Sequence, residues 1–98
     1  MERLPIKFEK EVLEKYGIEW NNYHYVHITK LEGIRTGGPG IYRDVNKYEI
    51  AGIALEAMGL SISPEGEYWN IYEGIPIAVD QDFCECVFKA VREIWEEK

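Results

Sequence analysis

Residues 68–95 read YWNIYEGIPIAVDQDFCECVFKAVREIW, and this stretch decides the fold class. Its first twelve residues are rich in aromatic and β-branched side chains, which predicts two antiparallel strands over 67–72 and 75–79, joined by a two-residue loop at Glu73-Gly74. From Asp80 onward the apolar residues recur every three or four positions, which predicts a helix with Asp80 as its N-cap. A hairpin followed by an amphipathic helix indicates a two-layer α+β domain.

A two-residue loop also sets the register of this hairpin, with Tyr68 opposite Val79 and Ile71 opposite Pro76. Side chains alternate between the two faces of a strand, so one face carries the apolar residues Trp69, Ile71, Pro76 and Ala78. If the helices cover only the opposite face, this apolar face stays exposed and needs a partner. A homodimer through the sheet would cover it, and so would the first helix of the chain.

The remaining elements are predicted on either side of a glycine-rich loop over 32–43. A helix is expected over 7–16 and ends before Gly17, and a strand over 23–30. A second helix is expected to open at Asn46, with capping-box spacing to Glu49, and to end at Met58 before Gly59; a short strand over 60–63 and a turn over 64–66 follow. The order is α-β-α-(β)-β-β-α: a small antiparallel sheet of three to four strands packed by three helices, in a single domain over 1–98.

The net charge of −7 is distributed unevenly along the chain. Residues 1–49 contain eight basic and eight acidic residues, whereas residues 50–98 contain three basic and ten acidic ones. No lysine or arginine occurs between Lys47 and Lys89. A surface of this sign repels the phosphate backbone, so we expect no direct binding to nucleic acid and a preference for basic partners.

The sequence predicts a cytoplasmic protein without a membrane span. No run of about 18 apolar residues occurs, and the N-terminus lacks the apolar centre of a secretory signal. Cys84 and Cys86 are two residues apart on the last predicted helix, where their side chains project about 200° apart, so they cannot form a disulfide with each other. Without a disulfide framework or an export signal, the cytoplasm is the expected compartment.

Acidic and aromatic residues cluster in the latter half of the chain and form the first candidate site. Carboxylates spaced along a strand edge and a helix start can imitate a row of phosphates, and aromatic side chains supply contact area. The simpler interpretation is a solvated acidic surface over an ordinary core. The candidate partner-binding residues are Glu65, Glu67, Tyr68, Trp69, Tyr72, Glu73, Asp80, Asp82 and Glu85.

The glycine-rich loop is the second candidate site. Glycines allow backbone N–H groups to converge on an anion, flanking arginines can bind phosphate in a bidentate manner, and an aromatic ring can stack on a base. The loop matches neither the P-loop nor the dinucleotide-binding fingerprint, so a turn-rich connection is the simpler interpretation. The candidate ligand-binding residues are Arg35, Thr36, Gly37, Gly38, Gly40, Tyr42 and Arg43.

The sequence gives no catalytic residue, no metal site and no cofactor. His24 and His27 are three apart on a predicted strand and so face opposite sides, which prevents them from chelating one ion. Cys84 and Cys86 are expected to be buried thiols that behave as small hydrophobic residues.

The sequence therefore predicts a non-enzymatic interaction protein. Its acidic-aromatic surface is expected to dock on a basic protein, such as one that handles nucleic acid, and to inhibit that protein by occupying its nucleic-acid site. The alternative is a module that binds a small anionic ligand, a nucleotide or phosphate, with the glycine-rich loop. A structural homo-oligomer subunit is the third interpretation.

Overall fold

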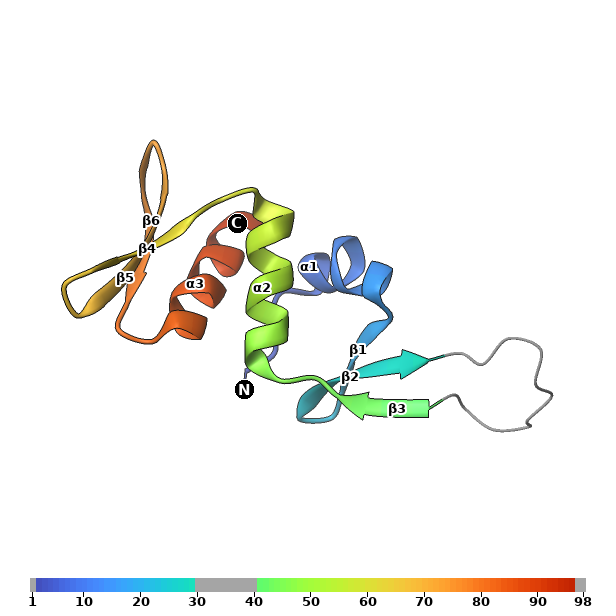
Figure 1. Cartoon of the computed structure of the whole chain (residues 1–98). Coiled ribbons are helices and arrows are strands. Elements are labelled where there is room, and N and C mark those ends of the chain that lie inside the picture. The colour runs from blue at the N-terminus through green and yellow to red at the C-terminus, as the bar shows by residue number, and fades with distance from the viewer. Residues whose placement is uncertain (1, 30–40, 97–98) are drawn as a thin grey trace.

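The computed structural model describes residues 2–29 and 41–96, and these residues form an α+β fold (Figure 1). The described elements are α1 (Ile6–Glu11), the 3₁₀ turn η1 (Leu13–Tyr16), β1 (Ile18–Asn21), β2 (His24–Thr29), β3 (Ile41–Asp44), α2 (Lys47–Met58), β4 (Ile62–Glu65), β5 (Tyr68–Glu73), β6 (Ile75–Asp80) and α3 (Phe83–Trp95). The predicted class and antiparallel pairing are confirmed. The prediction of one sheet is wrong, because the strands form two three-stranded sheets, β1-β2-β3 and β4-β5-β6.

Helices α2 and α3 pack side by side at the centre of the fold (Figure 1). The β4-β5-β6 sheet lies against α3, whereas α1 and the β1-β2-β3 sheet lie on the other side of the helix pair. One continuous cluster of buried apolar residues, from Leu4 to Val91, draws on the helices and on both sheets. None of the helices in the described part of the chain is long and apolar enough to cross a membrane.

The first sheet contains two strands that were not predicted. Residues 18–21 form β1, which pairs antiparallel with β2 and brings Ile18 opposite His27. Residues 41–44, of which the first three were assigned to the glycine-rich loop, form β3, with Arg43 also opposite His27. Both strands have only four residues, too few to show a periodic pattern, and each exists because β2 supplies its hydrogen-bonding partner.

The predicted helix over 7–16 is divided at Val12 into α1 and η1, and it ends before Gly17 as predicted. The second helix is confirmed over its predicted length, because the Asn46 side chain accepts hydrogen bonds from the backbone N–H groups of Tyr48 and Glu49. Ile50, Ala51 and Ala54 are its buried residues, and they face the core. Helices α1 and α2 therefore both contribute buried residues to one hydrophobic core.

The second sheet corrects the predicted register and turns. Pro64 and Glu65, which were assigned to a turn, belong to β4, where Glu65 lies opposite Tyr68. The loop between β5 and β6 is the single residue Gly74, at φ 74°. The pairing of the two strands also contains a β-bulge, where the register shifts between Ile71 and Tyr72. Glycine occupies this left-handed conformation at no steric cost, and this permits the tighter turn.

Because of the shorter loop and the bulge, Asn70 pairs with Val79, and Pro76 moves to a position opposite Tyr72. Trp69, Ile71 and Ala78 still share one face, as predicted, and this face packs on α3 and joins the core. This face was predicted to stay exposed if helices covered the other one; instead α3 covers it.

The last helix begins two residues later than predicted. Its N-cap is Asp82, whose side chain accepts a hydrogen bond from Glu85 N, so the prediction of Asp80 as the N-cap is wrong. Asp80 instead accepts from Asp82 N and holds the connection into the helix. The apolar stripe on α3 is buried from Cys84 to Val91, and only Ile94 of the predicted stripe is exposed.

Candidate protein-binding surface

The register of the second sheet gathers acidic residues at one of its ends. Glu65 lies opposite Tyr68, and Trp69 lies opposite Asp80, so the β4–β5 turn and the end of β6 are neighbours. The chain then passes directly into α3, whose first residues lie beside this end of the sheet (Figure 1). The carboxylates that this arrangement brings together are those of Glu65, Glu67, Asp80, Asp82 and Glu85.

The outer face of the second sheet carries exposed aromatic and aliphatic side chains. Alternation along β5 places Tyr68 and Tyr72 on the side away from α3, and the pairing of Asn70 with Val79 adds Val79. Tyr68 and Val79 are each 49% exposed and Tyr72 is 39% exposed. We call Tyr68, Tyr72 and Val79 the tyrosine face.

A hydrogen bond joins the tyrosine face to the acidic end of the sheet. The Tyr72 hydroxyl donates to Glu65 Oε1 across β4 and β5 at 2.9 Å. This bond to a carboxylate raises the pKa of the Tyr72 hydroxyl above its ordinary value. The hydrogen bond fixes the Tyr72 side chain over the sheet without a partner, so this part of the surface is ordered before binding.

Three of the nine predicted partner-binding residues have roles inside the fold. Trp69 lies on the covered face and packs edge-on against Phe83 with ring centroids 5.2 Å apart. Asp80 forms an ion pair with Lys89 at 2.7 Å; this cation, together with the Asp82 N–H, lowers the pKa of the Asp80 carboxyl. Asp82 caps α3. The six other residues remain on the exposed surface.

The basic residues of the first half of the chain do not neutralise this surface. Within residues 2–29 and 41–96, Arg3 pairs with Glu9 and Arg43 pairs with Glu49, both outside the second sheet. Lys89 is the one basic residue paired with a carboxylate of this surface in the described part of the chain. The carboxylates of Glu67 and Glu73 form no ion pair with a described basic residue, and they therefore produce an uncompensated negative field.

The predicted ligand loop is only partly described, since Arg35, Thr36, Gly37, Gly38 and Gly40 lie outside the described residues. Tyr42 and Arg43 belong to β3, and Tyr42 is half exposed. Arg43 Nη1 donates to both carboxylate oxygens of Glu49 at 3.0 and 3.2 Å, so an anion would compete with this carboxylate. The ligand role of the loop stays a prediction.

The two histidines and the two cysteines of the chain all lie in its described part. His24 lies beside Asp44, with Nε2 3.0 Å from Oδ1, and no group of three metal-ligating side chains occurs among the residues that were described. Cys84 and Cys86 are free and buried. Burial raises the pKa of both thiols, and Cys86 Sγ donates to the Trp69 carbonyl oxygen. Both cysteines are therefore part of the hydrophobic core.

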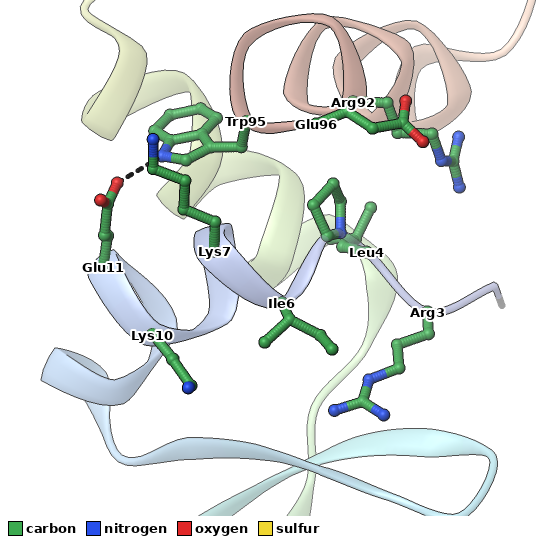
Figure 2. A pocket seen from close by; sticks show the side chains of 10 residues that line it. Arg3, Leu4, Ile6, Lys7, Lys10, Glu11, Arg92, Trp95 and Glu96 are labelled. Carbon is green, nitrogen blue, oxygen red and sulfur yellow. Dashed lines mark hydrogen bonds between the residues drawn. The ribbon is translucent and has the colours of Figure 1, made fainter. Parts of the chain in front are cut away.

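A cavity of about 650 Å³ was not foreseen from the sequence (Figure 2). It lies between the N-terminal segment with α1 and the end of α3, which are some ninety residues apart in the chain: Glu2 and Arg92 form an ion pair across its margin at 3.3 Å. No sequence signal pointed to this cavity, because nothing in the sequence placed Trp95 beside α1.

No family model, curated protein or solved structure matches the chain.

Proposed function

We propose that the protein binds a basic partner protein through the tyrosine face and the carboxylates beside it. The observation that carries this proposal is a sheet face on which none of the described helices packs, and on which two tyrosines and a valine are 39–49% exposed next to uncompensated carboxylates. Apolar surface that a fold leaves uncovered beside polar groups is typical of a protein interface.

The composition of the surface defines the partner. Tyrosines are enriched at the energetically dominant centres of interfaces, and here they occupy the middle strand of the sheet. Glu67 and Glu73 lie at the two turns that flank this strand, where they form a charged border. Such an arrangement favours a partner with lysines or arginines around an apolar centre, because opposite charges steer the encounter and the apolar contact holds it.

The mode of action is inhibition by occupation. A partner that handles nucleic acid has a basic surface for its own substrate, and a bound acidic domain would cover that surface. The proposal requires binding and no catalysis by this chain.

The proposal is tested by capturing a partner from a lysate of the source organism and measuring its affinity as a purified protein. Tyr68→Ala and Tyr72→Ala are each expected to weaken the complex about tenfold or more, the range of interface hot spots. Tyr23→Ala is the matched control, since Tyr23 is 84% exposed and lies at the other sheet. Equal losses in all three variants would contradict the proposal.

Charge reversal tests the electrostatic part. Glu67→Lys with Glu73→Lys is expected to slow association and to flatten its salt dependence between about 50 and 200 mM salt. Glu14→Lys with Glu19→Lys removes the same charge from the first half of the chain, and it should leave the association rate near that of the wild type. A complex insensitive to salt would refute the charge-steered interface.

A further inference from the structure

Asn70 is the one residue with an amide or charged side chain that is buried in the described part of the chain, and it is 8% exposed. Its neighbours on β5, Trp69 and Ile71, both pack against the core. Alternation along the strand therefore directs the Asn70 side chain to the opposite face, between Tyr68 and Tyr72. A nearly buried amide thus lies at the centre of the tyrosine face.

The Asn70 amide has no partner inside the described fold. Among residues 2–29 and 41–96, no backbone or side-chain group forms a hydrogen bond with it. No completely enclosed side-chain nitrogen or oxygen in these residues lacks a hydrogen bond, so the amide atoms of Asn70 reach the surface of the tyrosine face. Asparagine is disfavoured within strands, and a buried amide without a partner lowers stability. A residue that lowers stability at the centre of a binding surface indicates a role in binding.

The register of the sheet places a carboxylate diagonally across from this amide. Ser63 of β4 lies opposite Asn70, and Glu65 lies two residues further along the same face. Diagonal neighbours of this kind are about 7–8 Å apart, within reach of one planar guanidinium group. The Tyr72 hydroxyl donates to Glu65 Oε1, which orients the carboxylate, and Glu65 has no ion pair with the described basic residues. The face therefore offers an amide oxygen and a carboxylate as two acceptors for one donor group.

Tyrosine rings flank the amide along β5. Residues two apart on a strand are separated by about 7 Å, so a cation bound at Asn70 lies next to the rings of Tyr68 and Tyr72. A guanidinium group is planar and stacks on aromatic rings while it donates several hydrogen bonds, whereas an ammonium group is a strongly hydrated point charge. Glu67 and Glu73, at the turns on either side of β5, favour a cation over a neutral group.

We propose that Asn70 is the specificity-determining residue of the tyrosine face and that it receives an arginine side chain of the partner. The guanidinium group donates to Asn70 Oδ1 and to the Glu65 carboxylate, and it stacks on a tyrosine ring. This inference rests on the proposed function, and it narrows the basic partner to one that presents an arginine at the centre of its interface. Lysine does not replace the arginine, because an ammonium group has no flat surface for the ring.

The side-chain amides supply a direct test. The chain has four asparagines and one glutamine, and Asn70 is the one that lies within a strand of the second sheet. In ¹⁵N-labelled protein, acetyl-Gly-Arg-Gly-amide at millimolar concentration is expected to shift the Asn70 side-chain NH₂ signals in a saturable manner. The NH₂ signals of Asn21 and Asn46 should stay in place. The matched lysine peptide has the same charge and is expected to bind at least about fivefold more weakly.

Asn70→Leu separates binding from folding. Leucine has a similar branched shape without the polar atoms, so the midpoint of urea denaturation is expected to stay or to rise, while the arginine peptide binds about fivefold or more weakly. Asn21→Leu is the control, since Asn21 is exposed on β1 of the first sheet, and it should keep the affinity for the peptide. A lower midpoint in Asn70→Leu would show that the amide stabilises the fold, and it would overturn the inference.

The inference and the proposed function fail in different ways. If the two peptides bind equally and Asn70→Leu keeps full affinity, the arginine assignment is overturned, whereas the basic-partner surface stands. No shift of the Asn70 signals with the arginine peptide also overturns the assignment. The proposed function is decided separately, by the effect of Tyr68→Ala and Tyr72→Ala on the complex with the captured partner.

Discussion

The Tyr25 hydroxyl on β2 donates a hydrogen bond to Glu9 Oε2 on α1 at 2.7 Å and accepts one from Leu4 N at 2.9 Å. Arg3 binds the same carboxylate with Nε and Nη2, both at 3.0 Å. Burial, then the carboxylate of Glu9, raises the pKa of the Tyr25 hydroxyl well above its ordinary value. This phenol therefore connects the first sheet, α1 and the N-terminal segment.

Tyr25→Phe is expected to lower the free energy of unfolding by about 1–3 kcal/mol, because Leu4 N loses its acceptor and Glu9 loses a donor in a partly buried site. Urea denaturation at pH 7 measures this change. Tyr23→Phe is the control, since Tyr23 is exposed on the adjoining turn, and it should be neutral. A loss as small as that of the control would show that the hydroxyl contributes nothing to stability.

Asp80 predicts a specific loss of stability in acid. Its pKa is lowered below the ordinary 3.8 by Lys89 and by the backbone N–H of Asp82, so its charged form favours the folded state. This contribution is complete above the unfolded value and disappears as pH falls below about 4 through the lower folded value. We expect Asp80→Asn to be less stable than the wild type at pH 7 and to have a shallower decline from about pH 5 downward.

The matched control for Asp80→Asn is Glu73→Gln, which removes the same charge from an exposed turn. Asparagine keeps an acceptor for Asp82 N, so the comparison isolates the ion pair with Lys89. Thermal or urea unfolding across the pH range gives the two curves. Parallel curves for Asp80→Asn and Glu73→Gln would mean that the Asp80–Lys89 pair has no effect of its own.

Gly17 and Gly52 predict opposite effects of one substitution. Gly17 has φ 71°, and a Cβ there would lie 3.2 Å from the Ile28 carbonyl oxygen. Gly17→Ala should therefore destabilise the protein by about 1–2 kcal/mol or more. Gly52 lies within α2 with no neighbour near its Cβ position, so Gly52→Ala should stabilise it by about 0.5–1 kcal/mol. Urea denaturation decides both signs, and a stabilising Gly17→Ala would contradict the geometry at β2.

The buried thiols predict slow labelling. Cys84 is 1% exposed and Cys86 is fully buried, and burial raises the pKa of both. Ellman's reagent should label them on the order of 100-fold more slowly in the native protein than in urea, since reaction requires an opening of α3. An added thiol at an exposed position, Gln81→Cys, should react at once. Rapid labelling of all thiols in the native state would place Cys84 or Cys86 at the surface.

Local chemistry made several elements predictable. Asn46 satisfies the first N–H groups of α2, and the apolar period of residues 83–95 determines which side of α3 is buried. These features depend on neighbours within one or two turns, and the sequence records them directly. The acidic content of the second half was also predictable, although the distribution of roles among Asp80, Asp82 and Glu85 was not.

Pairing over longer distances was predicted less well. β1 and β3 each contain four residues whose strand conformation depends on β2, and neither was assigned. In the second hairpin, a one-residue loop and a bulge moved Pro76 from the predicted face of Trp69, Ile71 and Ala78 to a position opposite Tyr72. A slip of one residue exchanges the faces of a strand, so a small error in the turn changes which surface is exposed.

By itself, the sequence determined the α+β class, the positions of the two longer helices and the excess of carboxylates after residue 49. Only the tertiary structure decided that α3 covers the Trp69 side of the second sheet, that Tyr68 and Tyr72 face outward, and that Lys7 and Trp95 line one cavity. The physical reason is the range of the interactions: caps and periodicity act within a few residues, whereas strand register and the contact of the two chain ends depend on packing between residues far apart in the sequence.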